Sequence, residues 1–285
     1  MNQIGIEPIE QFLISHHRTC QQQERRLHIH NNAYEIMLFV SGNVDYFINN
    51  VTYHLKPGDL TFVGPDDIHG YFVKDDSPYE RLPVHIEIDY AAALSTEATD
   101  LLSCFASPSA RRLCHLDKEQ IHQFIGFVDA VIQAMNRGSF GQDIIVHSCI
   151  SMLLLMANEA QQADESAVSD VSPRIIRDAI DYISANLAGD ISVQTIADCL
   201  NISRSRLCHQ FKDFTGISLW NYVISRRIQR AQSLLREGVS ITETCYECGF
   251  KDYAHFVKAF SKVIGVPPGK YTKELPTYQM SGRPG

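Results

Sequence analysis

The sequence contains no uninterrupted apolar stretch long enough to span a bilayer. The longest apolar run, about eight residues in ISMLLLMA at 150–157, falls far short of the ~20 apolar residues that a membrane helix needs. The opening residues, MNQIGIEPIE, also lack the basic segment followed by an apolar one that marks a secretory signal. These two absences predict a cytoplasmic protein that makes no contact with a membrane.

A disulfide framework is missing as well. The eight cysteines are scattered through apolar contexts without regular spacing. Cys245 and Cys248 have the CxxC spacing of redox and zinc sites, but no second cysteine pair or nearby histidine completes a tetrahedron. We interpret both as small buried residues.

Charge is distributed unevenly along the chain, whose formal net charge is −8. Residues 1–173 hold 23 acidic and 10 basic side chains, a net of −13, whereas 174–285 hold 10 acidic and 15 basic ones, a net of +5. A basic back portion behind an acidic front favours contact of the back portion alone with a polyanion. A surplus of +5 also occurs in domains that bind no nucleic acid.

Short strands dominate the front of the chain. From about residue 27 to 90, segments such as YEIMLFV, VDYFIN and DLTFV are rich in β-branched and aromatic residues, with turn sequences such as SGN and KPGD between them. Many short strands at near-regular spacing are typical of a sandwich or barrel. We therefore expect an N-terminal arm at 1–26 and a β-barrel domain at 27–115.

Two helices are expected after the barrel, within 116–160. Apolar residues recur at three- and four-residue intervals from Ile121 to Ile132, and the segment 141–160 is apolar on nearly all sides. The second helix is therefore predicted to be buried, and a second copy of the chain is one partner that would bury it. Polar residues ending in a proline follow, so we expect a linker at 161–173.

The back portion contains an internal repeat. Residues 191–216 and 239–265 are two copies of one unit, in which Ala197 aligns with Cys245 at an offset of 48. Later positions align at an offset of 49, so one residue was gained at the turn. Each copy has a helix containing a small residue, a short break and a second helix, which are the requirements of a helix-turn-helix.

The second helix of each copy has an apolar face and a polar face. Ser203 and Asp252 stand where the N-caps of these helices belong. Polar side chains that are one, three and four residues apart share an exposed stripe, which can lie in a major groove and reach base edges. The residues expected to read bases are Ser205, Arg206 and His209 in the first copy and Ala254, His255 and Lys258 in the second.

A helix within 219–238 is expected to join the two copies. A continuous helix of about 18 residues spans ~27 Å, close to the ~34 Å between successive major grooves on one face of DNA. Its basic side chains suit phosphate contacts, although a solvated helix face is the alternative. Phosphate contacts are expected from Arg204, Arg226, Arg227, Arg230 and Lys251.

Histidines cluster ahead of the first long strand. The stretch LHIHNNAYEIMLFVSG at 27–42 places His28, His30 and Glu35 close together, and His69 follows later. The spacing resembles that of cupin barrels, whose four metal-binding positions hold these residues here. Three imidazoles and one carboxylate suit Fe, Mn, Ni or Zn. Alone, this resemblance implies a dioxygenase or an isomerase.

The back portion, 174–275, resembles the DNA-binding domain of AraC/XylS-family transcription regulators. The resemblance rests on IADCLNISRSRLCHQFKDFTGIS, RRIQRAQSLL and ITETCYECGFKDYAHFVKAFSKVIGVPPGKY. It implies a two-domain α+β chain, with a cupin-like barrel and dimerisation helices followed by an all-α domain with two helix-turn-helix motifs and a tail at 276–285. The family's base-contacting positions coincide with the six residues given above, although His209 stands where arginine is frequent.

The resemblance implies a DNA-binding transcription regulator, with activation favoured, rather than an enzyme. Its partners would be promoter DNA, RNA polymerase and a second copy of the chain. Sensor barrels of this family bind a small effector, frequently a sugar, usually without metal. The candidate effector-binding residues are His28, His30, Tyr34, Glu35, His69 and Arg81. The alternative is a divalent metal held by the four cupin positions, in a metal-dependent sensor or a metalloenzyme.

Overall fold

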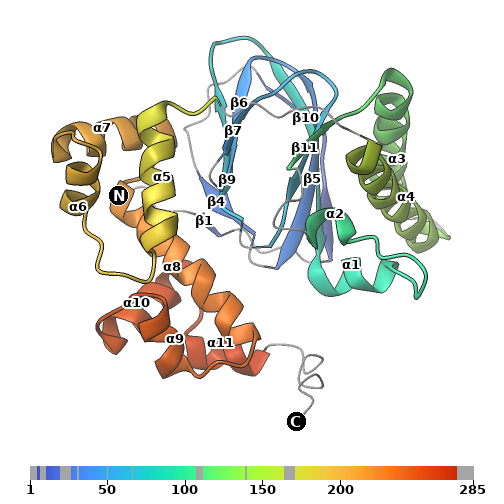
Figure 1. Cartoon of the computed structure of the whole chain (residues 1–285). Coiled ribbons are helices and arrows are strands. Elements are labelled where there is room, and N and C mark those ends of the chain that lie inside the picture. The colour runs from blue at the N-terminus through green and yellow to red at the C-terminus, as the bar shows by residue number, and fades with distance from the viewer. Residues whose placement is uncertain are drawn as a thin grey trace. The chain divides into compact units, whose positions relative to one another are not determined.

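The computed structural model describes residues 5–6, 11–19, 27–30, 32–49, 51–65, 67–106, 112–138, 140–163 and 171–274 (Figure 1). The chain divides into two compact units, and the main boundary falls between Val171 and Ser172. We call them the barrel unit and the helical unit. The expected tail at 276–285 and most of the expected linker lie outside the described residues.

Two facing sheets form the barrel unit (Figure 1). One sheet contains, in spatial order, β4 (His28–Ile29), β9 (His69–Val73), β6 (Val44–Ile48) and β7 (Val51–His54). The other contains β11 (Leu113–His115), β8 (Asp59–Val63), β5 (Ala33–Ser41), β10 (Tyr79–Glu87) and β2 (Phe12–Ile14), while β3 (His17–Thr19) also pairs with β10. A two-residue strand, β1, spans Gly5–Ile6. The two-domain α+β fold expected from the sequence is confirmed.

The segment expected to be an arm, 1–26, contains two strands of this sheet. β2 and β3 run antiparallel to β10, with Ile14 opposite Val84 and His17 opposite Arg81. The expectation of a plain arm was therefore wrong for 12–19. The edge of β10 away from β5 carries backbone N–H and C=O groups that need partners, and these two short strands supply them.

Strand alternation gives the barrel unit two apolar layers. Even-numbered residues of β5, such as Ile36 and Leu38, pack on the outer face of the sheet beneath helices. Odd-numbered residues, such as Met37 and Phe39, pack in the interior with Tyr46. The covering helices are α1 (Ile88–Leu94), α2 (Ser103–Ala106), α3 (Lys118–Arg137) and α4 (Gln142–Ala163) (Figure 1).

Helix α4 bears on the expectation that no segment could span a membrane. Among the described residues it is the one helix that is long and apolar enough to do so, by length and composition only. That expectation rested on short apolar runs only and not on the composition of the whole helix. Ile150, Leu153 and Leu154 of α4 are fully buried in the core of the barrel unit, which is how the core helix of a folded domain behaves.

The helical unit contains the helices that the repeat predicts. They are α5 (Arg174–Asn186), α6 (Val193–Cys199), α7 (Arg204–Thr215), α8 (Leu219–Arg236), α9 (Ile241–Glu247), α10 (Tyr253–Ile264) and α11 (Pro268–Glu274). Helices α6 and α7 form the first helix-turn-helix, and α9 and α10 form the second. Helix α8 joins them as one continuous helix of 18 residues.

Candidate effector site and nucleic-acid interface

A buried carboxylate with three imidazoles around it occupies the barrel interior. Glu35 lies on the inner face of β5 and is almost fully buried. Its Oε2 atom is 3.2 Å from Nε2 of His30, 3.3 Å from Nε2 of His69 and 2.9 Å from Nε2 of His85. The Tyr46 hydroxyl donates to Oε1 at 2.9 Å. Both carboxylate oxygens therefore have polar partners inside the barrel.

The environment of Glu35 favours its charged form. Burial acts to raise the pKa of Glu35, but the positive potential of His85 and His69, with hydrogen bonds from His30 and His69, outweighs it and holds the pKa well below its ordinary value. Burial, followed by the Glu35 charge, raises the pKa of Tyr46 well above its ordinary value. The pair is therefore a carboxylate and a neutral phenol.

The site draws on both sheets. His69 and Tyr46 come from β9 and β6, while Glu35 and His85 are cross-strand neighbours on β5 and β10. The His30 ring lies 5.0 Å from that of His69 and 4.4 Å from that of His85, measured between centroids. A site made of residues from both facing sheets can hold a molecule that enters the barrel.

The histidines also meet the chemical requirements of a metal site. One ligand atom from each of His28, His30, Glu35 and His69 lies within 4.8 Å of the others. Imidazole nitrogens and a carboxylate oxygen are ligands of zinc and other transition metals. The residues present therefore fit a divalent ion in both chemistry and spacing.

In the helical unit, each reading helix begins and ends in the same way. The Ser203 side chain caps α7 by accepting from the backbone N–H of Arg206, and the Asp252 side chain caps α10 by accepting from that of His255. Both predicted N-caps are confirmed. The turns repeat too, because the N–H of Ile202 donates to the carbonyl of Ala197 at 3.1 Å and that of Phe250 to Cys245 at 3.1 Å.

The polar stripes predicted on the two reading helices are exposed to solvent. Buried residues hold the opposite faces in the core, Leu207 and Phe211 on α7, and Phe256 and Phe260 on α10. The exposed residues are Ser205, Arg206 and His209 on α7 and Ala254, His255 and Lys258 on α10. Each helix therefore presents a row of polar or small side chains that a major groove can accommodate.

Comparison with known proteins identifies both units. A model described as AraC-like ligand binding domain matches residues 12–148, and one described as Helix-turn-helix domain matches 196–274. The chain belongs to the AraC family of transcription regulators. AraC-family membership fits both the barrel with its polar interior and the pair of helix-turn-helix motifs.

Several known proteins match most of the chain. The HTH-type transcriptional activator RhaR of Escherichia coli O139:H28 is 23% identical over 83% of each chain. RhaR of Pectobacterium atrosepticum is 25% identical over 86% of each chain. Among solved structures, apo ToxT K231A of Vibrio cholerae is 14% identical over 95% of this chain and 100% of that one, with a TM-score of 0.38. Both RhaR relatives are named as transcriptional activators.

Two of the predicted effector-binding residues differ in position from the others. His30, Glu35 and His69 meet inside the barrel, and half-buried His28 belongs to the same group. Tyr34 was wrongly predicted, because it points to the outer face of β5 and its ring packs 4.6 Å from that of Phe105.

Arg81 lies further along β10 from this group, at the position opposite Phe39 of β5. Two residues of the site were missed, His85 and Tyr46. The alternating strand sequence VHIEID carries a signal for His85, but only the register of β10 against β5 places it beside Glu35.

Four of the five basic residues expected to bind phosphate are exposed or only partly buried. Arg204, Arg230 and Lys251 are exposed, and Arg226 is partly buried. Lys251 forms an exposed ion pair with Asp190 at 2.6 Å, a contact that contributes little to stability.

Arg227 was wrongly predicted to bind phosphate. It is buried, its Nε donates to the carbonyl of Leu187 at 3.0 Å, and its Nη2 donates to that of Gly189 at 2.8 Å. Its guanidinium also lies 5.8 Å from the centroid of Phe250. Arg227 is therefore a structural residue that ties the loop after α5 to the second helix-turn-helix.

The CxxC pair lies in the core of the helical unit. Cys245 and Cys248 are fully buried, free cysteines. Burial raises the pKa of both thiols, that of Cys248 to about 12, so both are protonated at neutral pH. This arrangement agrees with their interpretation as small core residues rather than ligands or redox groups.

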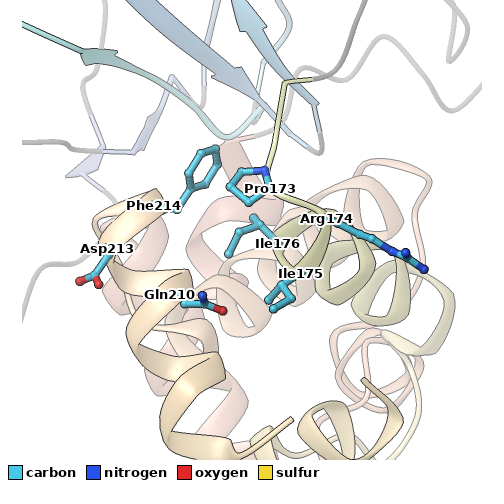
Figure 2. A pocket seen from close by; sticks show the side chains of 7 residues that line it. All are labelled: Pro173, Arg174, Ile175, Ile176, Gln210, Asp213 and Phe214. Atoms are coloured by element: carbon cyan, nitrogen blue, oxygen red, sulfur yellow. The ribbon is translucent and has the colours of Figure 1, made fainter. Parts of the chain in front are cut away.

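A separate cavity of about 400 Å³ lies in the helical unit between the start of α5 and the end of α7. Figure 2 shows its lining side chains, Pro173, Arg174, Ile175, Ile176, Gln210, Asp213 and Phe214. Arg174 is engaged with Asp178 at 3.4 Å. The lining has no buried cluster of polar groups comparable to the one in the barrel, so the barrel is the better candidate for a polar effector.

Proposed function

We propose that this AraC-family member is a cytoplasmic, effector-responsive transcriptional activator that binds promoter DNA as a homodimer and acts on RNA polymerase. The observation that carries the proposal is the pair of helix-turn-helix motifs with matching caps and turns and exposed polar stripes. The name of the RhaR relatives, transcriptional activators, supports the direction of regulation.

The two reading helices suit neighbouring major grooves. Ser205, Arg206 and His209 of α7 would read one segment of the promoter, and α10 would read the next. The 18 residues of α8 span about 27 Å, against ~34 Å for one turn of DNA. Phosphate contacts from the exposed basic residues Arg204, Arg230 and Lys251 and from Arg226 would supply affinity without sequence information.

The barrel interior would bind the effector, a carbohydrate-like molecule. Carboxylates, imidazoles and phenols are hydrogen-bond partners for sugar hydroxyls, and Glu35, His30, His69, His85 and Tyr46 present all three types together. The effector regulates only if its affinity differs between the DNA-competent chain and the incompetent one.

Helices α3 and α4 offer the surface for a second protomer. Apolar side chains at the tip and along this helix pair are solvent-exposed, namely Met135, Phe140, Ile144, Ile145 and Met152. Exposed apolar side chains gathered on one helix pair are typical of an interaction surface. Pairing through this surface would give a homodimer with four reading helices.

Selection of DNA from a random-sequence duplex pool with the full chain tests the proposal. We expect enriched sequences with two conserved blocks about 10 bp apart, present in two copies for a dimer, bound ~10³-fold or more tightly than scrambled DNA. Ile144→Glu, which places a charge on the proposed dimer surface, should reduce the enriched DNA to a single copy of the two blocks. Gln133→Glu, at an exposed polar position on α3, should leave both copies of the blocks in the enriched DNA. Absence of any enriched motif would contradict DNA recognition.

A metal-dependent sensor is a second candidate, because the ligand atoms of His28, His30, Glu35 and His69 lie within 4.8 Å of one another. These residues would hold a divalent ion, which would supply a Lewis-acidic anchor for effector hydroxyls. Elemental analysis of the purified chain tests this candidate. Stoichiometric metal that is lost in His30→Ala would support it, and a metal-free chain that still responds to effector would reject it.

A further inference from the structure

The inner face of β10 carries a positively charged side chain, that of Arg81, at some distance from Glu35 and its surrounding histidines. His85 and Arg81 share this face because they are four residues apart on one strand, and His85 contacts Glu35. Arg81 lies opposite Phe39 of β5 and opposite His17 of β3. Its Cα atom is therefore about 13 Å from that of His85 along the strand, a length in which one small polar molecule can contact both side chains.

Arg81 has no acidic partner among the residues that the structure describes. Its guanidinium carbon lies 4.3 Å from the ring centroid of Tyr71, and its buried Nε atom has no hydrogen-bond partner in the described structure. The Glu35 carboxylate contributes to raising the pKa of Arg81, but its oxygens already have three imidazoles and the Tyr46 hydroxyl as partners. A guanidinium in this setting retains unused hydrogen-bonding capacity, which is costly when buried.

The charge of Arg81 persists in this setting. Burial opposes the charged form, but the hydroxyls of Tyr71 and Tyr79 and the Glu35 carboxylate outweigh burial and raise the pKa of Arg81. The neighbouring imidazole of His17 experiences the opposite effect. Burial, followed by the charges of Arg81, His85 and His16, lowers the pKa of His17. The positive charge of Arg81 is therefore among the causes that disfavour a second positive charge on His17.

We propose that the effector carries a carboxylate, which binds Arg81 while its hydroxyls face Glu35 and the surrounding histidines. The effector would then be an acidic sugar, such as a uronic or aldonic acid, rather than a neutral one. A guanidinium binds a carboxylate through two parallel hydrogen bonds, and the bound carboxylate would give the Arg81 Nε atom the acceptor that it lacks. The inference rests on the proposed effector role of the barrel.

Matched pairs of ligands test the inference on the full chain. Calorimetric titration would make two comparisons. In the first, D-galactose is compared with D-galacturonate. In the second, D-glucose is compared with both D-glucuronate and D-gluconate. We expect at least one acid to bind about ten-fold or more tightly than its neutral counterpart. The same acid should change the affinity of the chain for its selected DNA. This wild-type comparison needs no variant, so it stays decisive if an Arg81 variant fails to fold.

Variants then test whether Arg81 is the residue that causes the preference for the acid over the neutral sugar. Arg81→Gln should remove about ten-fold or more of the affinity for the acid and leave that for the neutral sugar, and Arg81→Lys should restore part of it. Lys56→Gln, which removes an equal charge from an exposed position, should change neither. Equal binding of acids and neutral sugars, failure of every acid to bind, or an unchanged preference in Arg81→Gln would overturn the inference. The DNA selection decides the proposed function separately.

Discussion

The two helix-turn-helix motifs share their framework but differ at the turn between their helices. Both reading helices end at a glycine in the left-handed region, Gly216 with φ 77° and Gly265 with φ 86°. At the turn, however, the first motif uses Asn201 with φ 53° and the second uses Gly249 with φ 80°. Asparagine is one of the few residues other than glycine that adopts positive φ readily.

The surroundings of the two turns explain the difference. A Cβ atom on Gly249 would lie 2.8 Å from the carbonyl oxygen of Leu187, 2.9 Å from that of Ala188 and 2.9 Å from Nη2 of Arg227. Asn201 is exposed to solvent. The second turn is thus packed beneath the loop after α5, whereas the first turn faces solvent. The repeat kept its fold while its two turns acquired different structural roles.

Substitution at the two turns should give the largest difference between the motifs. We expect Gly249→Ala to lower the free energy of unfolding by about 3–4 kcal/mol, because it adds a backbone clash to the cost of positive φ. Asn201→Ala, which meets only the conformational cost, should lower it by about 1 kcal/mol. Urea denaturation followed by circular dichroism measures both. Similar losses for the two variants would show that the second turn is not specially packed.

The arginines of α8 give the next largest contrast. Arg227→Met should destabilise the helical unit by about 2–3 kcal/mol, because the carbonyls of Leu187 and Gly189 lose charged hydrogen bonds. Arg230→Met, at an exposed position of the same helix, should change stability by less than about 0.5 kcal/mol and weaken DNA binding instead. Thermal denaturation and a salt titration of DNA affinity separate the two effects. If both variants were equally stable, Arg227 would not have the structural role proposed here, and its interpretation as a phosphate-binding residue would stand.

Local sequence signals predicted the helical unit well. Ser203 and Asp252 could be identified as N-caps because a cap depends only on residues two or three positions away. The polar stripes followed from helical spacing for the same reason. The role of Arg227 could not be predicted, since its partners, the carbonyls of Leu187 and Gly189, are about 40 residues distant in sequence. Charge alone does not show whether a guanidinium is exposed or buried.

The barrel depends on pairing between distant strands, and its predictions were less complete. His85 joins Glu35 only through the register of β10 against β5, which the sequence does not encode locally. Strands β2 and β3 are short and lie in a segment without clear alternation, so their pairing with β10 was missed. Strand alternation would have excluded Tyr34, because its neighbour Glu35 faces the interior and successive side chains point to opposite faces.

The remaining contrast concerns the exposed polar stripes, whose residues differ between the two reading helices. On the selected DNA, His209→Ala should cost about 1–3 kcal/mol and relax the preference in one conserved block, and Lys258→Ala should do the same in the other. Lys273→Ala, an exposed lysine on α11, is the charge control and should preserve both blocks. Fluorescence anisotropy on duplexes with single base changes measures the effect. If either variant lost affinity equally on every sequence, with a smaller salt dependence, its residue would contact phosphate rather than bases. The two motifs would then differ in what they recognise as well as in how their turns are packed.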